Sequence, residues 1–126
     1  MSGFSFDSNI IIDALAGYGP ARAEIDRATD FDSRAWISRA VWIEVMSKGE
    51  GEGLKRAEAF LSGFQIDEVD AEIGRRAAAL RRDRKSFKAM DAIILATAQA
   101  RGRVLVTRNT KDFPAEMPGI RVPYKL

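Results

Sequence analysis

The sequence predicts an α/β protein in which helices cover both faces of a small, mostly parallel sheet. Short apolar segments of strand length alternate along the chain with longer segments of helical periodicity, which is typical of parallel strands joined by crossover helices. A length of 126 residues suits a single domain with one core, over residues 1–126. A hydrophobic fraction of 46% with 30% charged residues excludes the composition of a disordered chain.

Turn and capping residues mark the first elements. Residues 4–6 are a short apolar strand, and Asp7-Ser8-Asn9 is a turn or N-cap before a helix over 10–15. Glycine and proline within 17–20 end this helix, and a second helix is predicted over 21–28. The chain therefore begins with the order strand, turn, helix, helix.

The middle of the chain contains a second strand and a glycine-rich segment. Residues 35–37 are the strand, and Ser38 is the expected N-cap of a helix that extends to Met46. Glycine occupies three of the five positions from Gly49 to Gly53. Because ordering glycine has a high entropic cost, we predict a flexible loop there, followed by a helix over 54–64.

The second half of the chain continues the alternation. The expected elements are a strand over 65–69, a basic helix over 71–84, a helix over 89–100 capped by Gly102, a strand over 104–107 and an edge strand over 120–122. Residues 89–100 are apolar almost all round, so this helix is expected to be central and buried.

The chain has no cysteine and no histidine, which removes whole classes of chemistry. Without cysteine there is no disulfide, thiolate nucleophile or thiolate metal site. Without histidine there is no Ser-His-Asp relay, no His-rich zinc site and no histidine pair for metal-free RNA cleavage. An enzyme made from this sequence must use carboxylates, lysines, hydroxyls or a metal ion.

Composition alone indicates neither a membrane nor a nucleic acid. No apolar run approaches the roughly 20 residues of a membrane span, and the N-terminus lacks a signal segment, so we expect a cytoplasmic protein without a membrane partner. The formal net charge of +2 is too small to argue for nucleic acid by itself. The distribution of charge therefore matters more than its sum.

Acidic residues stand where an open parallel sheet forms its ligand sites, beyond the carboxyl ends of the strands. Asp7 follows the first strand, Asp91 opens the central helix, and Asn109 and Asp112 follow the 104–107 strand, while Glu44 lies two turns into its helix. Clustered carboxylates repel one another unless a cation intervenes. A site of oxygen ligands selects Mg²⁺, with Mn²⁺ as a substitute, and such an ion can activate water against a phosphodiester.

Each of these acids also has a purely structural explanation. Asp7 is a natural helix cap, Asp91 complements the helix dipole, Glu44 suits a solvated helix position and Asp112 suits a turn. The functional interpretation depends on their joint placement.

Four segments together carry a family resemblance: Phe6 to Ile10, Glu44, Asp91 to Ala98, and Val106 to Phe113. In this order and spacing the chain resembles the PIN-domain ribonucleases, and most closely the VapC-type toxins of bacterial type II toxin-antitoxin systems. Two positions depart from the usual pattern, since Ser8 replaces a threonine and Met90 replaces a frequent proline.

The resemblance implies a three-layer α/β/α sandwich and assigns roles to single residues. Asp7, Glu44 and Asp91 would be metal-binding acids, and either Asn109 or Asp112 would supply the fourth ligand, Asp112 directly or through water. The supporting hydroxyl and amide groups near the metal would come from Ser8, Asn9 and Thr107. Asp7, Glu44, Asp91 and Asp112 would be the catalytic acids.

Basic residues gather between Arg75 and Lys88, where seven stand against one acid and give a local net charge of +6. This segment is a candidate phosphate track leading to Asp91, and the alternative is a solvated, arginine-rich helix face. The residues expected to bind RNA are Arg81, Arg82, Arg84, Lys85, Lys88 and Arg108.

The apolar residues of the segment 41–64 are either core or the lining of a groove for an amphipathic partner. They are Trp42, Met46, Leu54, Phe60, Leu61 and Phe64. The family resemblance implies an antitoxin partner and a homodimer.

The leading hypothesis is a metal-dependent endoribonuclease toxin. A signalling receiver domain is a weaker alternative, because it needs paired acids after the first strand and a lysine after the last, whereas Ser8 follows Asp7 and Arg108 follows Thr107. A catalytically silent module that binds RNA or a partner is a third possibility.

Overall fold

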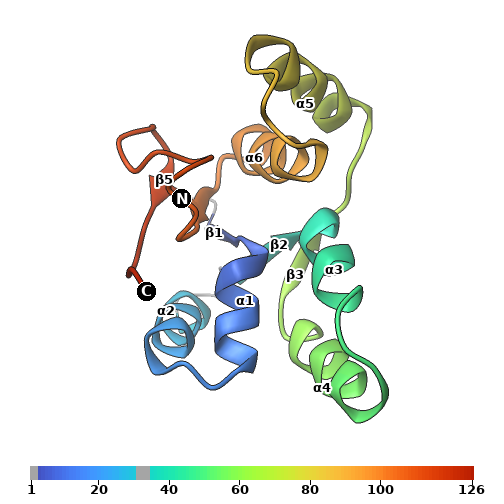
Figure 1. Cartoon of the computed structure of the whole chain (residues 1–126), viewed down its shortest axis with the longest axis vertical. Helices are drawn as coiled ribbons and strands as arrows, with labels where there is room; N and C mark the ends of the chain where they lie inside the picture. Colours follow the sequence, from blue (N-terminus) through green and yellow to red (C-terminus); the bar gives the residue numbers. More distant parts are fainter. Residues whose placement is uncertain (1–2, 31–34) are drawn as a thin grey trace.

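The computed structural model describes residues 3–30 and 35–126, and within these ranges the chain forms five strands and six helices (Figure 1). The strands are β1 (Phe4–Phe6), β2 (Ala35–Ser38), β3 (Gln65–Asp67), β4 (Val104–Val106) and β5 (Ile120–Arg121). The helices are α1 (Ser8–Leu15), α2 (Gly19–Thr29), α3 (Arg39–Met46), α4 (Gly51–Leu61), α5 (Ala71–Asp83) and α6 (Ala89–Arg101).

The strands form one parallel sheet in the order β3-β2-β1-β4-β5. The chain moves outward from β1 to β3 through α1 to α4, then returns across the sheet to β4 through α5 and α6. Because parallel crossovers are right-handed, connections running in opposite directions lie on opposite faces. Figure 1 shows α5 and α6 on one side of the strands, with α1, α2 and α4 on the other. The predicted α/β fold with three layers is therefore confirmed.

The core is one cluster of buried hydrophobic side chains between the sheet and its helices. Phe6, Ile37 and Leu105 from the three central strands have no exposed surface. Six of the thirteen residues of α6 are buried, and Gly102 ends this helix in the left-handed conformation at φ 69°. The expectations of a central α6 and of a glycine cap are both confirmed.

The starts of two helices were predicted wrongly, and the helix predicted over 54–64 and the strand predicted over 65–69 end earlier, at Leu61 and Asp67. Helix α4 begins at Gly51, so only the first part of the predicted Gly49–Gly53 loop lies outside a helix. Glu52 in the first turn complements the helix dipole there. Pro20 was expected to end the first helix, but it stands in the first turn of α2, where a proline needs no hydrogen-bond donor. In both cases the same residues that interrupt one helix begin the next.

The register of the sheet places the candidate site. Phe6 pairs with Val106, so the next residues, Asp7 and Thr107, leave the sheet side by side at its carboxyl edge. Ser38 ends the neighbouring strand β2 at the same edge and caps α3 through a 3.1 Å hydrogen bond from the Ala40 amide. Within the described residues, no helix has the length and apolarity needed to cross a membrane.

Candidate active site

Asp7 is the most buried acid of the predicted set, with 3% of its surface exposed. It caps α1 by accepting a 2.8 Å hydrogen bond from the Ser8 amide. Its other oxygen accepts hydrogen bonds from Thr107 Oγ1 at 2.7 Å and Asn9 Nδ2 at 3.3 Å. These donors are uncharged, and burial raises the pKa of Asp7 despite them, with the Glu44 charge adding to the rise. Among the residues that the structure describes, no cation compensates this buried carboxylate.

Glu44 reaches the same site from α3. Ser8 Oγ donates a 2.7 Å hydrogen bond to Glu44 Oε1 and lies 3.4 Å from Asp7 Oδ1. One hydroxyl therefore bridges two carboxylates that are 37 positions apart in the sequence. The solvated alternative for Glu44 does not describe this geometry, because its carboxylate faces the first turn of α1.

Asp91 stands in the first turn of α6 and is partly buried. Burial raises its pKa to about 6, and the negative charges of Asp112, Asp7 and Glu44 add to the rise, in that order, against the opposing charge of Lys88. Since charges act strongly only over short distances, all three other acids are electrostatic neighbours of Asp91. The structure therefore places the four predicted catalytic acids in one region, where Asp7 and Glu44 share the Ser8 hydroxyl.

Asn109 and Asp112 come from the loop after β4 and are bonded to each other. Asn109 Nδ2 donates to Asp112 Oδ2 at 3.0 Å, and the Asp112 amide donates to Asn109 Oδ1 at 3.3 Å. The Asn109 amide donates in turn to Thr107 Oγ1 at 3.0 Å. Asn109 thus uses its side chain to hold Asp112, and the charge of Asp112 helps to raise the pKa of Asp91. Which of the two supplies the fourth ligand stays a prediction.

The donor set consists of carboxylates with hydroxyl and amide groups, which fits a hard divalent ion. Among residues 3–30 and 35–126, no group of three acidic side chains has the geometry to hold an ion as it stands. Mg²⁺ commonly takes only one or two direct carboxylates and keeps several waters. The buried, uncompensated Asp7 and the raised pKa of Asp91 are what a cation at this place would relieve.

The basic residues expected to bind RNA fall into two groups. In the first group, an open hollow of about 410 Å³ is lined by Arg81, Arg82 and Lys85 together with Ala78. Lys88 is exposed and immediately precedes α6, and its charge lowers the pKa of Asp91.

Arg84 and Arg108 form the second group, since each donates two guanidinium hydrogen bonds within the chain, whereas Arg81 donates one, from Nε to the Phe87 carbonyl at 2.9 Å. Arg84 donates to the carbonyls of Asp112 and Lys111 and lies over the Phe87 ring, with 4.7 Å to its centroid. Arg108 forms a bidentate ion pair with Asp13. A contact of either arginine with RNA stays a prediction.

Several residues near the site were not singled out from the sequence. Ser38 Oγ lies 3.3 Å from Thr97 Oγ1 and so links β2 to α6, and Tyr124 Oη donates a 2.7 Å hydrogen bond to Asp13. Asp13 had one available signal, because it is a lone acid within the apolar run from Ile10 to Leu15. Nothing local in the sequence marks Tyr124.

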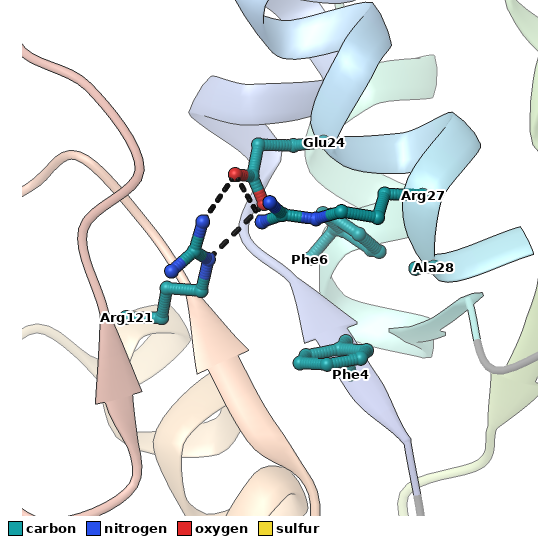
Figure 2. Close-up of a pocket in the computed structure, with 6 residues that line it drawn as sticks. All are labelled: Phe4, Phe6, Glu24, Arg27, Ala28 and Arg121. Carbon is teal, nitrogen blue, oxygen red and sulfur yellow. Dashed lines mark hydrogen bonds and ion pairs between the residues drawn. The ribbon is translucent and has the colours of Figure 1, made fainter. Parts of the chain in front are cut away.

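A second pocket of about 290 Å³ lies apart from the acids, between α2 and the strands β1 and β5 (Figure 2). Its lining is Phe4, Phe6, Glu24, Arg27, Ala28 and Arg121. Glu24 accepts hydrogen bonds from both arginines, as the dashed lines in Figure 2 mark. The single carboxylate of this pocket is thus bonded to two guanidinium groups, which leaves a net charge of +1. None of the four catalytic candidates lines it.

A parallel sheet in the order β3-β2-β1-β4-β5, with acids from β1, α3, α6 and the β4 loop at its carboxyl edge, defines the class of PIN domains. The sequence model of the PIN-domain family matches residues 5–115, and the chain belongs to this family.

The chain is similar to solved chains from toxin-antitoxin complexes. A complex from Klebsiella pneumoniae contains a chain with 38% identity and a TM-score of 0.86, covering 98% of this chain and 100% of its own length. A chain of DNA-bound VapBC from Salmonella typhimurium has 26% identity and a TM-score of 0.77, covering 96% of this chain and 96% of its own length. FitAcB from Neisseria gonorrhoeae shares the fold at 21% identity, with a TM-score of 0.78 and coverage of 98% and 99%. No curated protein sequence matches this chain. The resemblance to VapC-type PIN toxins is confirmed.

Proposed function

We propose that this PIN-domain protein is a magnesium-dependent endoribonuclease and the toxin of a toxin-antitoxin pair. The observation that carries the proposal is the convergence of four acids: Asp7, Glu44, Asp91 and Asp112. Asp7 is buried and has no cation beside it in the described part of the chain, and the pKa of Asp91 rises to about 6. A cluster of this kind is costly to fold unless it binds a positive ion. The family it belongs to consists of metal-dependent nucleases.

Different residues of the chain would bind the ion, orient the carboxylates and accept a proton during hydrolysis. Mg²⁺, when bound, would lower the pKa of a water and neutralise charge on the scissile phosphate, and Mn²⁺ would substitute. Asp7 and Asp91 would hold the ion, with Asp112 and Glu44 acting directly or through retained waters. Ser8, Asn9 and Thr107 fix these carboxylates through the hydrogen bonds already described. Glu44 and Asp112 are more exposed than Asp7 and can accept the proton of the attacking water.

RNA would approach along the basic hollow of α5. Arg81, Arg82 and Lys85 line this hollow, and Lys88 lies between it and Asp91 in the sequence, with its charge acting on that acid. Regularly spaced cations bind the phosphate backbone without reading bases, because phosphates carry no sequence information. The arrangement supports a polyanionic substrate whose scissile phosphate reaches the acids.

A protein antitoxin would cover the site. The similar chains come from toxin-antitoxin complexes. Ile43, which precedes Glu44 on α3, is a large hydrophobic residue with 47% of its surface exposed. By contrast, Trp42, Met46 and Phe60 pack against the core, and Leu61 and Phe64 belong to it, so a partner groove can use only part of the apolar segment 41–64.

A homodimer is a further expectation from the family resemblance, and light scattering after gel filtration tests it.

RNA digestion with and without EDTA tests the proposed activity. Wild-type protein should cleave RNA in Mg²⁺ and stop when EDTA is added, and Asp7→Asn and Asp91→Asn should each abolish cleavage while remaining folded. Asp26→Asn is the matched control, since Asp26 is an exposed acid on α2 outside the cluster. Full activity of both cluster variants contradicts the proposal. Metal-independent RNA binding without cleavage by the wild type would favour the silent binding module.

A further inference from the structure

Arg108 and Asp13 form a bidentate ion pair next to the acids. Arg108 Nε donates to Asp13 Oδ2 at 2.6 Å, and Arg108 Nη2 donates to Asp13 Oδ1 at 3.0 Å. The Asp13 side chain is 10% exposed and that of Arg108 is 32% exposed. Two parallel charge-assisted hydrogen bonds fix both the distance and the relative orientation of their groups. The pair therefore fastens α1 to the loop that follows β4.

Tyr124 adds a third donor to Asp13 from near the end of the chain. Its hydroxyl donates a 2.7 Å hydrogen bond to Asp13 Oδ2, and its ring packs edge-on against Tyr18, with 5.0 Å between the ring centroids. Hydrogen bonding from Arg108 lowers the pKa of Asp13 despite partial burial. Asp13 thus stays ionised at neutral pH, with both oxygens engaged.

Arg108 also belongs to the backbone that carries the site. Its amide donates a 3.3 Å hydrogen bond to Asn9 Oδ1, while Asn9 Nδ2 donates to Asp7 Oδ2. On one side of Arg108, Thr107 donates to Asp7, and on the other side Asn109 holds Asp112. Both the backbone and the side chain of Arg108 are therefore attached to α1.

We propose that Arg108, held by Asp13 and Tyr124, is a positioning residue that fixes the loop 107–112 against α1 and so sets the placement of Asp112 relative to Asp7. The effect of this positioning on metal binding rests on the proposed function, because the placement of Asp112 matters only if the acids bind a divalent ion. This role is separate from the predicted contact of Arg108 with RNA, since it uses the two nitrogens that donate to the nearly buried Asp13 carboxylate.

A second ion pair of the same type provides a matched control. Arg121 binds Glu24 through Nε and Nη2 and joins β5 to α2, beside the pocket in Figure 2. Neither side chain hydrogen-bonds to a candidate ligand. The Glu24 side chain is 12% exposed, which is close to the 10% of the Asp13 side chain. Glu24→Gln should therefore disturb an ion pair of comparable geometry without moving the loop 107–112.

Amide hydrogen exchange tests whether the ion pair orders the loop. The probes are the amides of Arg108, Asn109, Asp112 and Phe113, each of which donates a hydrogen bond in the structure. Asp13→Asn should speed their exchange by about tenfold or more relative to wild type. Glu24→Gln should leave these four amides unchanged. Equal protection of the loop in wild type and Asp13→Asn overturns the proposal.

Titration with Mn²⁺ alone, followed by electron paramagnetic resonance, tests the consequence for the site. Residues that orient metal ligands typically contribute about 10- to 100-fold to affinity, so Asp13→Asn should raise the Mn²⁺ Kd at least tenfold and Glu24→Gln should not. Tyr124→Phe removes one hydrogen bond and should act in the same direction more weakly, which keeps the test valid if Asp13→Asn is poorly folded. An unchanged Kd despite a loosened loop overturns the positioning role.

A double-mutant cycle separates this role from general destabilisation. If Asp13 acts through Arg108, the pair Asp13→Asn with Arg108→Gln should weaken Mn²⁺ binding no more than the stronger single variant. Additive losses contradict the proposal. Wild-type protein that binds no Mn²⁺ would contradict the proposed function instead, and loop exchange would still decide whether the ion pair orders the loop.

Discussion

The hydroxyl of Ser8 donates a 2.7 Å hydrogen bond to Glu44 and so connects the first turn of α1 with an acid on α3. The same residue donates its amide to Asp7. Ser8 therefore holds two acids of the cluster at once, one through its backbone and one through its side chain. The backbone contact survives any substitution other than proline, whereas the Glu44 contact depends on the hydroxyl.

Replacing Ser8 should separate these two contacts. Ser8→Ala should lower RNA cleavage by about 10- to 100-fold, because Glu44 loses the group that orients it. Ser8→Thr keeps the hydroxyl and should retain activity within a few-fold. Cleavage rates at saturating Mg²⁺ measure both variants, and thermal melts control for folding. Equal activity of Ser8→Ala and wild type would show that the orientation of Glu44 does not matter.

Without a divalent ion, the protein should be more stable at about pH 5 than at about pH 7. Burial raises the pKa of Asp7, and burial and three neighbouring acids raise that of Asp91 to about 6. Such groups stabilise the fold fully below their unfolded pKa of 3.8, and this contribution is lost as the pH rises through their folded pKa. Asp13 acts in the opposite sense, because its pKa is lowered in the folded state. Its contribution to stability is present above pH 3.8 and is lost as the pH falls through the folded pKa.

Thermal melts in EDTA and in Mg²⁺ over a range of about pH 4 to 8 measure this dependence. Mg²⁺ should raise the Tm most at neutral pH, where the acids are ionised, and Asp91→Asn should flatten the pH profile in EDTA. If the two series of melts coincide at every pH, the acids do not form a shared cation site.

The basic hollow of α5 should control affinity for RNA and its dependence on salt. On an Asp7→Asn background that does not cleave, Arg82→Ala or Lys85→Ala should weaken binding and reduce the slope of log K against log salt by about one unit each. Lys55→Ala is the control, because Lys55 is an exposed cation on α4, across the sheet from α5. Filter binding at several salt concentrations measures the slope. An identical slope in all variants contradicts an RNA path over α5.

The ion pair of Asp67 and Arg103 should be important for stability. Both side chains are at least nine-tenths buried, two hydrogen bonds of 2.7 and 2.8 Å join them, and Arg103 lies over the Trp36 ring. Asp67→Ala removes the carboxylate from a buried cation and should lower the free energy of unfolding by about 3 to 5 kcal/mol. Urea denaturation measures the change.

The exposed ion pair between Arg39 and Glu68 is the comparison, since water screens such pairs. Glu68→Ala should leave the urea midpoint nearly unchanged. Equal losses of stability in Asp67→Ala and Glu68→Ala would show that burial of the Asp67 pair has no special effect.

The sequence predicted the elements well because each has a local signal. Val104 to Val106 is an apolar run, Asp7 and Ser38 are capping residues, and Gly102 occupies the one position after α6 that requires a left-handed backbone. Errors occurred where one residue has two meanings. Proline interrupts a helix because it lacks an amide donor, and for the same reason it suits the first turn of a helix, where Pro20 stands.

The sequence by itself determined the fold class, the chemistry that remains without histidine and cysteine, and the four acids as candidates for one site, because the type of each element and of each residue is written locally. Only the tertiary structure decided that the side chain of Asn109 is bonded to Asp112, that Arg84 and Arg108 bind the chain itself, and that Tyr124 reaches Asp13. Those relations join residues up to 111 positions apart, and a side chain's partner depends on which strands become neighbours, which no local pattern records.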